Sequence, residues 1–210
     1  MSIATTTSGP GGWDDNYIDA LSEQGWALLP GFLSAEQVAG LRWEAMQSED
    51  WRRAGVGLAG QTESNIRRDH TIWMQGDTGP QQDYLAAMEQ IRTQVNRALF
   101  AGLFEYEAHF AHYPPGAFYR KHVDALRGRG ARVLTSVCYL NPHWAPGDGG
   151  ELVLYSDTDE ARIINHIQPA GGDLLLFWSE RFPHEVLPAH TDRYSIAGWF
   201  RRNIETANPL

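Results

Sequence analysis

Cysteine is almost absent from this chain. Cys138 is the only one among 210 residues, so no internal disulfide can form. A chain without disulfides suits a reducing compartment, and we therefore expect a cytoplasmic location. No run approaches the about 18 apolar residues of a membrane-spanning helix, and the N-terminus lacks the basic and apolar segments of a signal peptide. We expect a soluble protein that does not act at a membrane.

Basic residues are also scarce. The chain has 17 Lys and Arg against 26 Asp and Glu, a formal net charge of -9. This balance opposes sequence-independent nucleic-acid binding, which depends on neutralising phosphates, and we expect no nucleic-acid partner. The basic residues are unevenly distributed, and a local excess consists of Arg120, Lys121, Arg127, Arg129 and Arg132, with Arg67 and Arg68 elsewhere. An acidic cosubstrate or partner explains this excess about as well as an ordinary solvated loop does.

The sequence shows no internal repeat. Residues 1–12 are rich in Ser, Thr and Gly without periodicity, and we predict a disordered tail there. Residues 13–210 suit one domain with a sizeable core. A hydrophobic content of 42%, with 8 Trp, 21 Gly and 11 Pro, is typical of a globular protein rich in loops.

The first half of the chain favours helices. Apolar residues at helical spacing predict helices over 14–24, 34–48 and 81–100, the second opened by the capping box Ser34-Ala-Glu-Gln37. Short strands are predicted over 26–29 and 66–75. Residues 52–65, rich in Gly and small polar residues, predict a long loop that could act as a mobile lid.

The second half changes to short β-type runs broken by turns. Eight such runs with no helical stretch between them favour a double-sheet jelly roll over a parallel α/β sheet. With supporting N-terminal helices first and strands afterwards, the predicted fold class is α+β. The predicted strands are 105–113, 118–124, 132–140, 151–155, 161–168, 172–178, 184–187 and 193–201.

A possible metal site lies in the segment Phe-Tyr-Arg-Lys-His-Val-Asp-Ala at 118–125. His122 and Asp124 are two positions apart in a predicted strand, so both side chains should leave the same face. They could be two ligands of a 2-His-1-carboxylate triad for ferrous iron, completed by His184 if its strand is a neighbour. Taken alone, the pair is explained more simply by a solvated strand face or a His–Asp hydrogen bond.

A second feature is an arginine in a strand without carboxylates. In Arg193-Tyr-Ser195-Ile-Ala-Gly-Trp199 alternate residues share a face, so Arg193 and Ser195 should point together into the interior. A guanidinium binds a carboxylate through two parallel hydrogen bonds, so a bound dicarboxylate is a reasonable occupant. The Tyr139 hydroxyl could donate to the same carboxylate. A structural salt bridge is the competing interpretation for Arg193.

Together these motifs resemble the iron and 2-oxoglutarate-dependent oxygenases, most of all the prolyl hydroxylases of the hypoxia-sensing type. The resemblance extends over about residues 26–202. It rests on Ile-Arg-Arg-Asp-His-Thr-Ile-Trp at 66–73, Tyr113-Pro-Pro-Gly, Tyr119-Arg-Lys-His122-Val-Asp124, Cys138-Tyr139-Leu140-Asn141, Gly149-Gly150-Glu-Leu152, and Leu-Phe-Trp-Ser-Glu-Arg-Phe-Pro-His184-Glu-Val followed by Arg193-Tyr.

The resemblance implies a double-stranded β-helix that binds iron, 2-oxoglutarate and O2, with ascorbate as reductant. It places iron on His122, Asp124 and His184, and 2-oxoglutarate on Arg193, Tyr139 and Leu152, beside Ser195. It implies hydroxylation of a prolyl residue in a protein at C4, with a translation elongation factor as a candidate substrate in bacteria.

The same resemblance suggests residues for the protein substrate. Arg67 and Asp69 correspond to polar residues beside the family's mobile loop, and Arg132 could pair with Asp69, although an ordinary surface ion pair is as good an interpretation. Tyr119 and Trp199 are candidates to line a pocket around the proline ring, with core packing as the alternative for Trp199. We expect His109 and His112 in a strand, and His143, His166 and His190 at turns, to bind no iron.

Two other functions remain open. The same triad could hydroxylate another residue or a small molecule, such as a free amino acid or a nucleobase. The chain could instead be a non-catalytic metal-binding jelly roll or a zinc protein. Arg193 discriminates between these classes, because a site that only holds zinc needs no carboxylate clamp.

Overall fold

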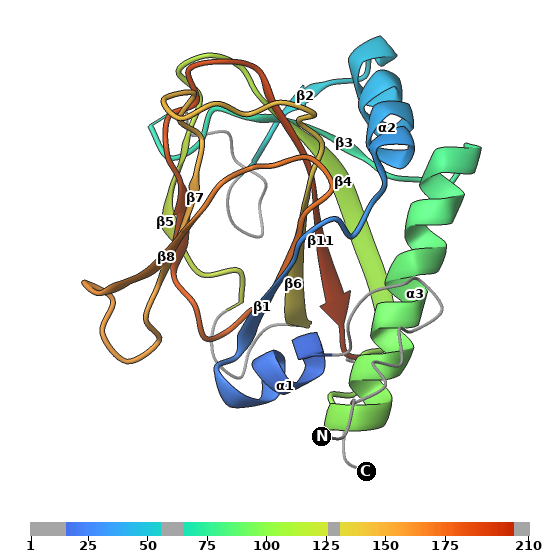
Figure 1. Cartoon of the computed structure of the whole chain (residues 1–210), viewed down its shortest axis with the longest axis vertical. Helices are drawn as coiled ribbons and strands as arrows, with labels where there is room; N and C mark the ends of the chain where they lie inside the picture. Colours follow the sequence, from blue (N-terminus) through green and yellow to red (C-terminus); the bar gives the residue numbers. More distant parts are fainter. Residues whose placement is uncertain (1–15, 56–64, 126–130, 204–210) are drawn as a thin grey trace, which may run out of the picture.

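The computed structural model describes residues 16–55, 65–125 and 131–203, which form two antiparallel sheets (Figure 1). The larger sheet has the order β1-β9-β6-β11-β4-β3-β2, and the smaller has the order β5-β10-β7-β8. The larger contains β1 (Trp26–Leu29), β2 (Arg52–Arg53), β3 (His70–Trp73), β4 (Glu105–Tyr113), β6 (Arg132–Tyr139), β9 (Leu174–Trp178) and β11 (Arg193–Arg201). The smaller contains β5 (Tyr119–His122), β7 (Leu152–Tyr155), β8 (Ile163–Ile167) and β10 (His184–Val186).

Three helices support the larger sheet: α1 (Asn16–Glu23), α2 (Ala35–Gln47) and α3 (Gly79–Leu99) (Figure 1). The Ser34 hydroxyl accepts a hydrogen bond from the Gln37 backbone amide, and the Gln37 side-chain oxygen accepts one from the Ser34 backbone amide. The predicted capping box therefore opens α2. Thr78 caps α3, which ends at Phe100 in a left-handed conformation with φ of 52°. None of the helices that the structure describes has both the length and the apolar character required to cross a bilayer.

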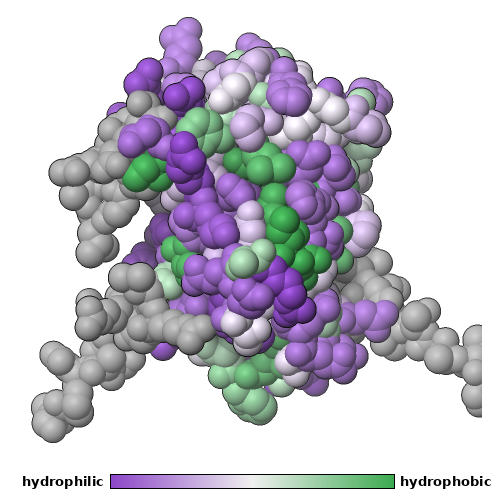
Figure 2. Space-filling view, turned by 90° about the vertical axis from the view of Figure 1, so that its left-hand side faces the viewer, coloured by the Kyte–Doolittle hydropathy of each residue, from purple (hydrophilic) through white to green (hydrophobic). Residues whose placement is uncertain are grey.

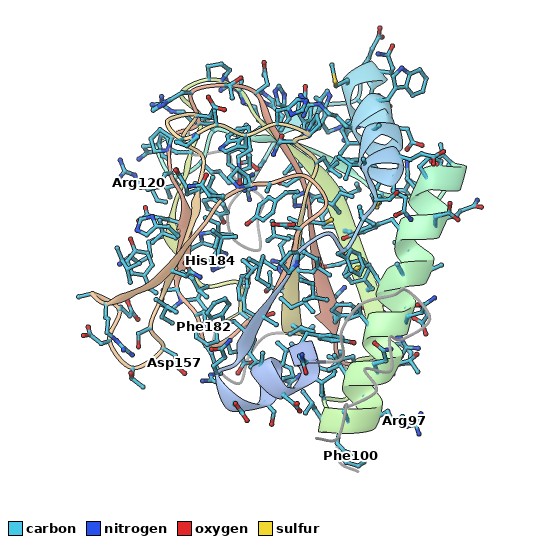
Figure 3. The ribbon with its side chains drawn as sticks, in the orientation of Figure 1. Arg97, Phe100, Arg120, Asp157, Phe182 and His184 are labelled. Carbon is cyan, nitrogen blue, oxygen red and sulfur yellow. The ribbon has the colours of Figure 1, made fainter. Side chains whose placement is uncertain are left out.

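Alternation along the strands creates two separate apolar layers. On β6, Leu134 and Cys138 face the layer shared with the helices, whereas Val137 and Tyr139 face the layer between the two sheets. The outer side of the smaller sheet is mostly hydrophilic (Figure 2). Arg120 projects outward from this sheet, whereas His184 and Phe182 lie on its inner side (Figure 3). Polar residues on an inner strand face therefore enter the space between the sheets.

The predicted α+β double-stranded β-helix is confirmed, and each of the eight predicted strands after residue 104 is present. The strand predicted over 66–75 is wrong in extent, because β3 covers only His70–Trp73 while Arg67 forms a bridge to Tyr119 at the edge of the smaller sheet. The loop predicted over 52–65 begins with the strand β2, and His166 lies in β8 rather than at a turn. Residues 1–12 and 56–64 lie outside the described residues, and the single domain over 13–210 stays a prediction.

Candidate metal and cosubstrate site

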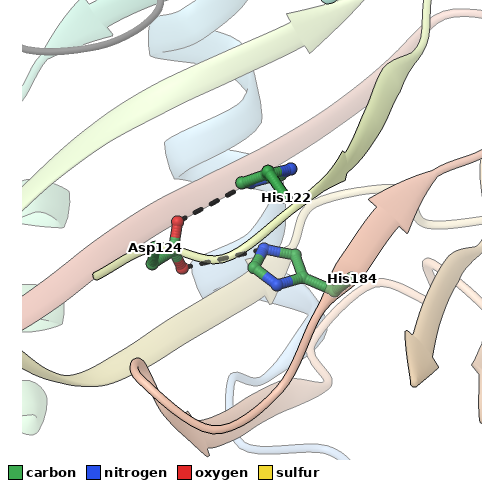
Figure 4. Close-up of side chains that lie close together, drawn as sticks. All are labelled: His122, Asp124 and His184. Atoms are coloured by element: carbon green, nitrogen blue, oxygen red, sulfur yellow. Dashed lines mark ion pairs between the residues drawn. The ribbon is translucent and has the colours of Figure 1, made fainter. Parts of the chain in front are cut away.

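The three predicted metal ligands converge between the sheets (Figure 4). His122 ends β5 and His184 begins β10, and the two residues are directly opposed in the antiparallel ladder. Nε2 of His122 lies 3.7 Å from Oδ1 of Asp124, and Nε2 of His184 lies 3.7 Å from Oδ2. Asp124 is not on the strand as predicted, because β5 ends at His122 and the chain bends before it reaches the carboxylate.

Backbone carbonyls set the tautomers of both histidines. Nδ1 of His122 lies 2.8 Å from the Arg120 carbonyl oxygen, and Nδ1 of His184 lies 3.1 Å from that of Phe182. Since a carbonyl only accepts, each Nδ1 carries a hydrogen, and in the neutral imidazole this leaves the Nε2 lone pair free for a metal. A separation of 3.7 Å is too long for a hydrogen bond but suits two ligands of one ion with bonds of about 2.1 Å.

The surroundings favour the protonation states that a divalent cation needs. Burial, together with the neighbouring His184, lowers the pKa of His122 to about 3, so this imidazole is neutral. Burial alone would raise the pKa of Asp124. His184, His122 and a hydrogen bond from Thr135 outweigh burial and lower that pKa below its ordinary value. Neutral imidazoles with a carboxylate are a donor set that fits ferrous iron.

Arg193 is buried between the sheets with part of its guanidinium unpaired. Its Nε donates to the Gly150 carbonyl at 2.8 Å, and its Nη1 donates to Oγ of Ser195 at 3.1 Å. Among the described residues, neither Nη2 of Arg193 nor the hydroxyl of Tyr139 has a hydrogen-bond partner, and the guanidinium carbon lies 5.3 Å from the Tyr139 ring centre. A buried cation and a hydroxyl donor that share one wall fit a carboxylate.

Backbone and apolar residues complete this end of the interior. Gly150 has a φ of 68°, and a Cβ there would lie 2.9 Å from Cδ of Arg193. A glycine at this position therefore leaves room for the Arg193 side chain. Leu152 is buried in the same apolar cluster as Tyr139. Tyr113, which the sequence did not single out as a site residue, packs its ring 4.8 Å from the Arg193 guanidinium carbon.

Arg67 and Asp69 pair with each other. Nη2 of Arg67 lies 2.5 Å from Oδ2 of Asp69, and Nε lies 2.8 Å from Oδ1, while Asp69 is 1% exposed. Burial lowers the pKa of Arg67, but its hydrogen bond and ion pair with Asp69 raise it overall. The Arg67 guanidinium covers the Tyr119 ring at 4.1 Å, and that ring stacks on His122 at 3.6 Å between centres. Contacts therefore run from the ion pair to a metal ligand.

Of the two interpretations left open for Arg132, the pairing with Asp69 is wrong, because Arg132 pairs with Glu107 instead. Nε of Arg132 lies 3.5 Å from Oε1 of Glu107, and the guanidinium lies 3.5 Å from the Trp199 ring centre. The guanidinium of Arg67 already binds both Asp69 oxygens, so Arg132 contacts Glu107 on β4 and Trp199 on β11 instead. Trp199 is buried, and its Nε1 has no hydrogen-bond partner among the described residues.

Two hydroxyls behind the metal ligands were missed from the predicted site. Oγ1 of Thr135 donates to Oδ2 of Asp124 at 2.8 Å, and Oγ of Ser179 lies 2.9 Å from the same Thr135 oxygen. A signal for Thr135 existed, because strand alternation places it on the face of Tyr139. Ser179 follows β9 in a turn, where no periodicity indicates its direction.

The chain is similar to a known protein family and to known prolyl hydroxylases. The family model described as "2OG-Fe(II) oxygenase superfamily" matches residues 108–201. The prolyl hydroxylase EGLN3 of Homo sapiens is 32% identical over 87% of this chain and 81% of its own length. The hypoxia-inducible factor prolyl hydroxylase of Caenorhabditis elegans is 30% identical over 93% of this chain, which spans only 29% of that relative.

Solved structures show the same similarity. A prolyl-4-hydroxylase from Pseudomonas putida is 39% identical, with a TM-score of 0.80 over 89% of this chain and 97% of that one. A prolyl hydroxylase from Trichoplax adhaerens, solved with a peptide of the hypoxia-inducible factor oxygen degradation domain, is 28% identical with a TM-score of 0.80. It covers 92% of this chain, and the match spans 91% of that protein.

Proposed function

The chain belongs to the 2OG-Fe(II) oxygenase superfamily, among its prolyl hydroxylases of the hypoxia-inducible-factor type, and we propose that it hydroxylates a prolyl residue of a protein at C4. The observation that carries this proposal is the buried Arg193, whose Nη2 lacks a partner among the described residues. Because that arginine shares the interior with a His-His-Asp group, the site can hold a metal and a dicarboxylate together.

In this proposal His122, Asp124 and His184 hold the ferrous ion. A donor set of two imidazole nitrogens and one carboxylate would leave room for small molecules to bind the metal as well. When bound, iron and 2-oxoglutarate use O2 to replace a C–H bond by C–OH, as 2-oxoglutarate becomes succinate and CO2. The chain then needs no general base, and its residues bind, orient and exclude water.

Arg193, Tyr139, Ser195 and Leu152 are the proposed cosubstrate residues. Nη2 of Arg193 and the Tyr139 hydroxyl would donate to the carboxylate far from the metal. Ser195 holds Nη1 of Arg193, which fixes the orientation of the guanidinium plane. Leu152 supplies an apolar wall in the same cluster. Pre-oriented donors of this kind lose little freedom when the ligand binds.

The proposed protein-substrate residues are Arg67, Asp69, Tyr119, Arg132 and Trp199. The Arg67 guanidinium covers the Tyr119 ring, the Arg132 guanidinium covers the Trp199 ring, and Tyr119 stacks on His122. Such packed aromatic and guanidinium surfaces suit a proline ring and its neighbouring peptide groups. A translation elongation factor is the candidate substrate that we propose to test first, with ascorbate as the reductant and the cytoplasm as the location.

The proposed function predicts two products in one experiment. Purified protein with ferrous iron, 2-oxoglutarate and ascorbate is mixed with a bacterial lysate, and succinate and peptide masses are measured. We expect succinate together with the mass of one added oxygen on a proline. Protein with His122 replaced by Ala should yield neither product, and a His143→Ala control should yield both. Absence of succinate with the unaltered chain contradicts oxygenase activity, whereas oxidation on other residues alone contradicts prolyl specificity.

A further inference from the structure

Asp124 is held differently from the two histidines of the metal group. His122 and His184 lie opposite each other in a β-ladder, which fixes where their backbones are. Asp124 follows the end of β5 in a bend and belongs to no strand. Its carboxylate nevertheless lies in the interior, with 7% of the side chain exposed. Side-chain hydrogen bonds must therefore set the direction of this carboxylate.

A chain of two buried hydroxyls reaches the carboxylate. Oγ1 of Thr135 donates to Oδ2 of Asp124 at 2.8 Å, which uses the only hydroxyl hydrogen of Thr135. Ser179 lies 2.9 Å from the same oxygen and so must be the donor in that second bond. Thr135 is 2% exposed and Ser179 is fully buried, so water does not compete for either bond. Both hydrogens point along the chain toward Asp124.

The hydroxyl chain connects Asp124 with the larger sheet and with the segment that leads to His184. Thr135 lies in the middle of β6, at the centre of the larger sheet. Ser179 lies between β9 and β10, on the turn that leads to His184, and its amide donates to the Val133 carbonyl at 3.0 Å. The Asp124 carboxylate is thus tied both to the rigid larger sheet and to the segment of His184.

We infer that Thr135 and Ser179 are positioning residues that fix the Asp124 carboxylate for a divalent cation. This inference rests on the proposed metal site and adds to it two residues that do not touch the metal. Loss of an outer hydrogen-bond partner of a metal ligand typically weakens metal binding by about 10–100-fold. Ser179 should act only through Thr135.

The test uses Mn2+ as the probe and isothermal titration calorimetry as the readout, which requires no turnover. Thr135→Val, which keeps the shape but loses the hydroxyl, should weaken Mn2+ binding about tenfold or more. Thr135→Ser restores the donor and should recover most of the affinity. Ser179→Ala should weaken binding less than Thr135→Val, and the double variant with both changes should be no weaker than Thr135→Val alone.

Ser136→Ala is the matched control, because Ser136 is an equally buried hydroxyl on the opposite face of β6 and bonds to Tyr106 at 2.8 Å. It should change the unfolding temperature in EDTA but not the Mn2+ affinity. Equal affinity in the unaltered chain and Thr135→Val overturns the inference, and so does equal loss in Ser136→Ala. If Thr135→Val does not fold, unchanged affinity in Ser179→Ala overturns it. No Mn2+ binding by the unaltered chain would instead overturn the proposed metal site.

Discussion

The residues proposed to bind the cosubstrate and the residues proposed to bind the substrate, called here the cosubstrate side and the substrate side, are held in place in different ways. On the cosubstrate side, Arg193, Ser195 and Tyr139 lie on two central strands of the larger sheet, and backbone pairing brings Ser195 opposite Tyr139. On the substrate side, Arg67 and Asp69 lie between a loop and a short strand, and contacts between side chains hold them. Strand register therefore positions the first side, whereas ion pairs and ring contacts position the second.

This difference explains where each side is sensitive to substitution. A residue on a central strand keeps its place when its side chain changes, so a substitution there removes one interaction with a ligand. A residue held by a buried ion pair loses its support when its partner changes. We therefore expect variants on the cosubstrate side to alter catalysis with little loss of stability, and variants of the Arg67–Asp69 pair to alter stability first.

The largest effect should come from the metal group that both sides share. Asp124→Ala removes the only carboxylate among the three ligands, and we expect succinate formation to fall by more than the roughly 100-fold typical of outer-shell changes. The measurement is succinate release with ferrous iron and 2-oxoglutarate. His143→Ala, an exposed histidine elsewhere, serves as the control. Turnover that survives in Asp124→Ala would show that the metal is held in another way.

A smaller effect is expected on the cosubstrate side alone. Arg193→Lys keeps the charge but loses the planar fork, so the KM for 2-oxoglutarate should rise about 10–100-fold while Mn2+ affinity stays the same. Arg42→Lys is the matched control, because Arg42 also bonds to a backbone carbonyl, that of Leu140, but packs on Tyr194. An unchanged KM in Arg193→Lys would remove Arg193 from the cosubstrate site.

The ion pair on the substrate side should reveal itself through unfolding. Asp69→Asn leaves the Arg67 guanidinium without its carboxylate in a buried place, and we expect a loss of about 3 kcal/mol in the free energy of unfolding. Glu89→Gln breaks the exposed pair with Arg92, 2.5 Å apart, and should cost less than about 1 kcal/mol. Urea unfolding monitored by fluorescence measures both. Equal losses would mean that the Arg67–Asp69 pair is no more important than a surface pair.

The smallest effect concerns His109, which is buried between Trp73 and Trp199 on the substrate side. Burial lowers its pKa to about 4, below the roughly 6.5 of an unfolded chain. Between these two pKa values the unfolded state therefore binds more protons than the folded state. The contribution of His109 to the free energy of unfolding is complete above about pH 6.5 and is lost as the pH falls toward 4.

Because of His109, the free energy of unfolding at about pH 5.5 should be lower than at pH 8 by on the order of 1 kcal/mol. Urea unfolding of the unaltered chain and of His109→Gln at both pH values measures this difference, because other titrating groups contribute equally to both proteins. If the two proteins lose the same stability on acidification, His109 is not the neutral buried group described above.

Much of the fold could be predicted from the sequence, because its main signals are local. The capping box at Ser34 and the alternation in 105–113 and 193–201 are read from neighbouring residues, and the corresponding elements form. The strand predicted over 66–75 was too long because local residue preferences do not reveal where a chain leaves one sheet for the edge of another. The bridge from Arg67 to Tyr119 depends on residues far apart in the sequence.

For the candidate site, too, residues with a local sequence signal could be predicted and residues without one could not. His122, His184, Arg193 and Tyr139 were predicted from strand periodicity and from resemblance, and they converge as strands allow. The partner of Arg132 was left open between Asp69 and an ordinary ion pair, because a guanidinium on a flexible stem can reach several carboxylates and only the folded chain determines that Arg67 occupies Asp69. Ser179 was missed for a similar reason, since its turn has no repeating pattern.

The opposition of His122 and His184 in one ladder has a practical consequence. A slip of a single residue between β5 and β10 would turn one of the two imidazoles to the outer surface and leave the other inside, since neighbouring strand positions face opposite ways. Chains with the wrong register would then keep only two of the three proposed ligands and would bind the metal weakly. The stoichiometry of tightly bound metal in a purified batch should thus count the correctly folded molecules, which offers a quality measure that needs no substrate.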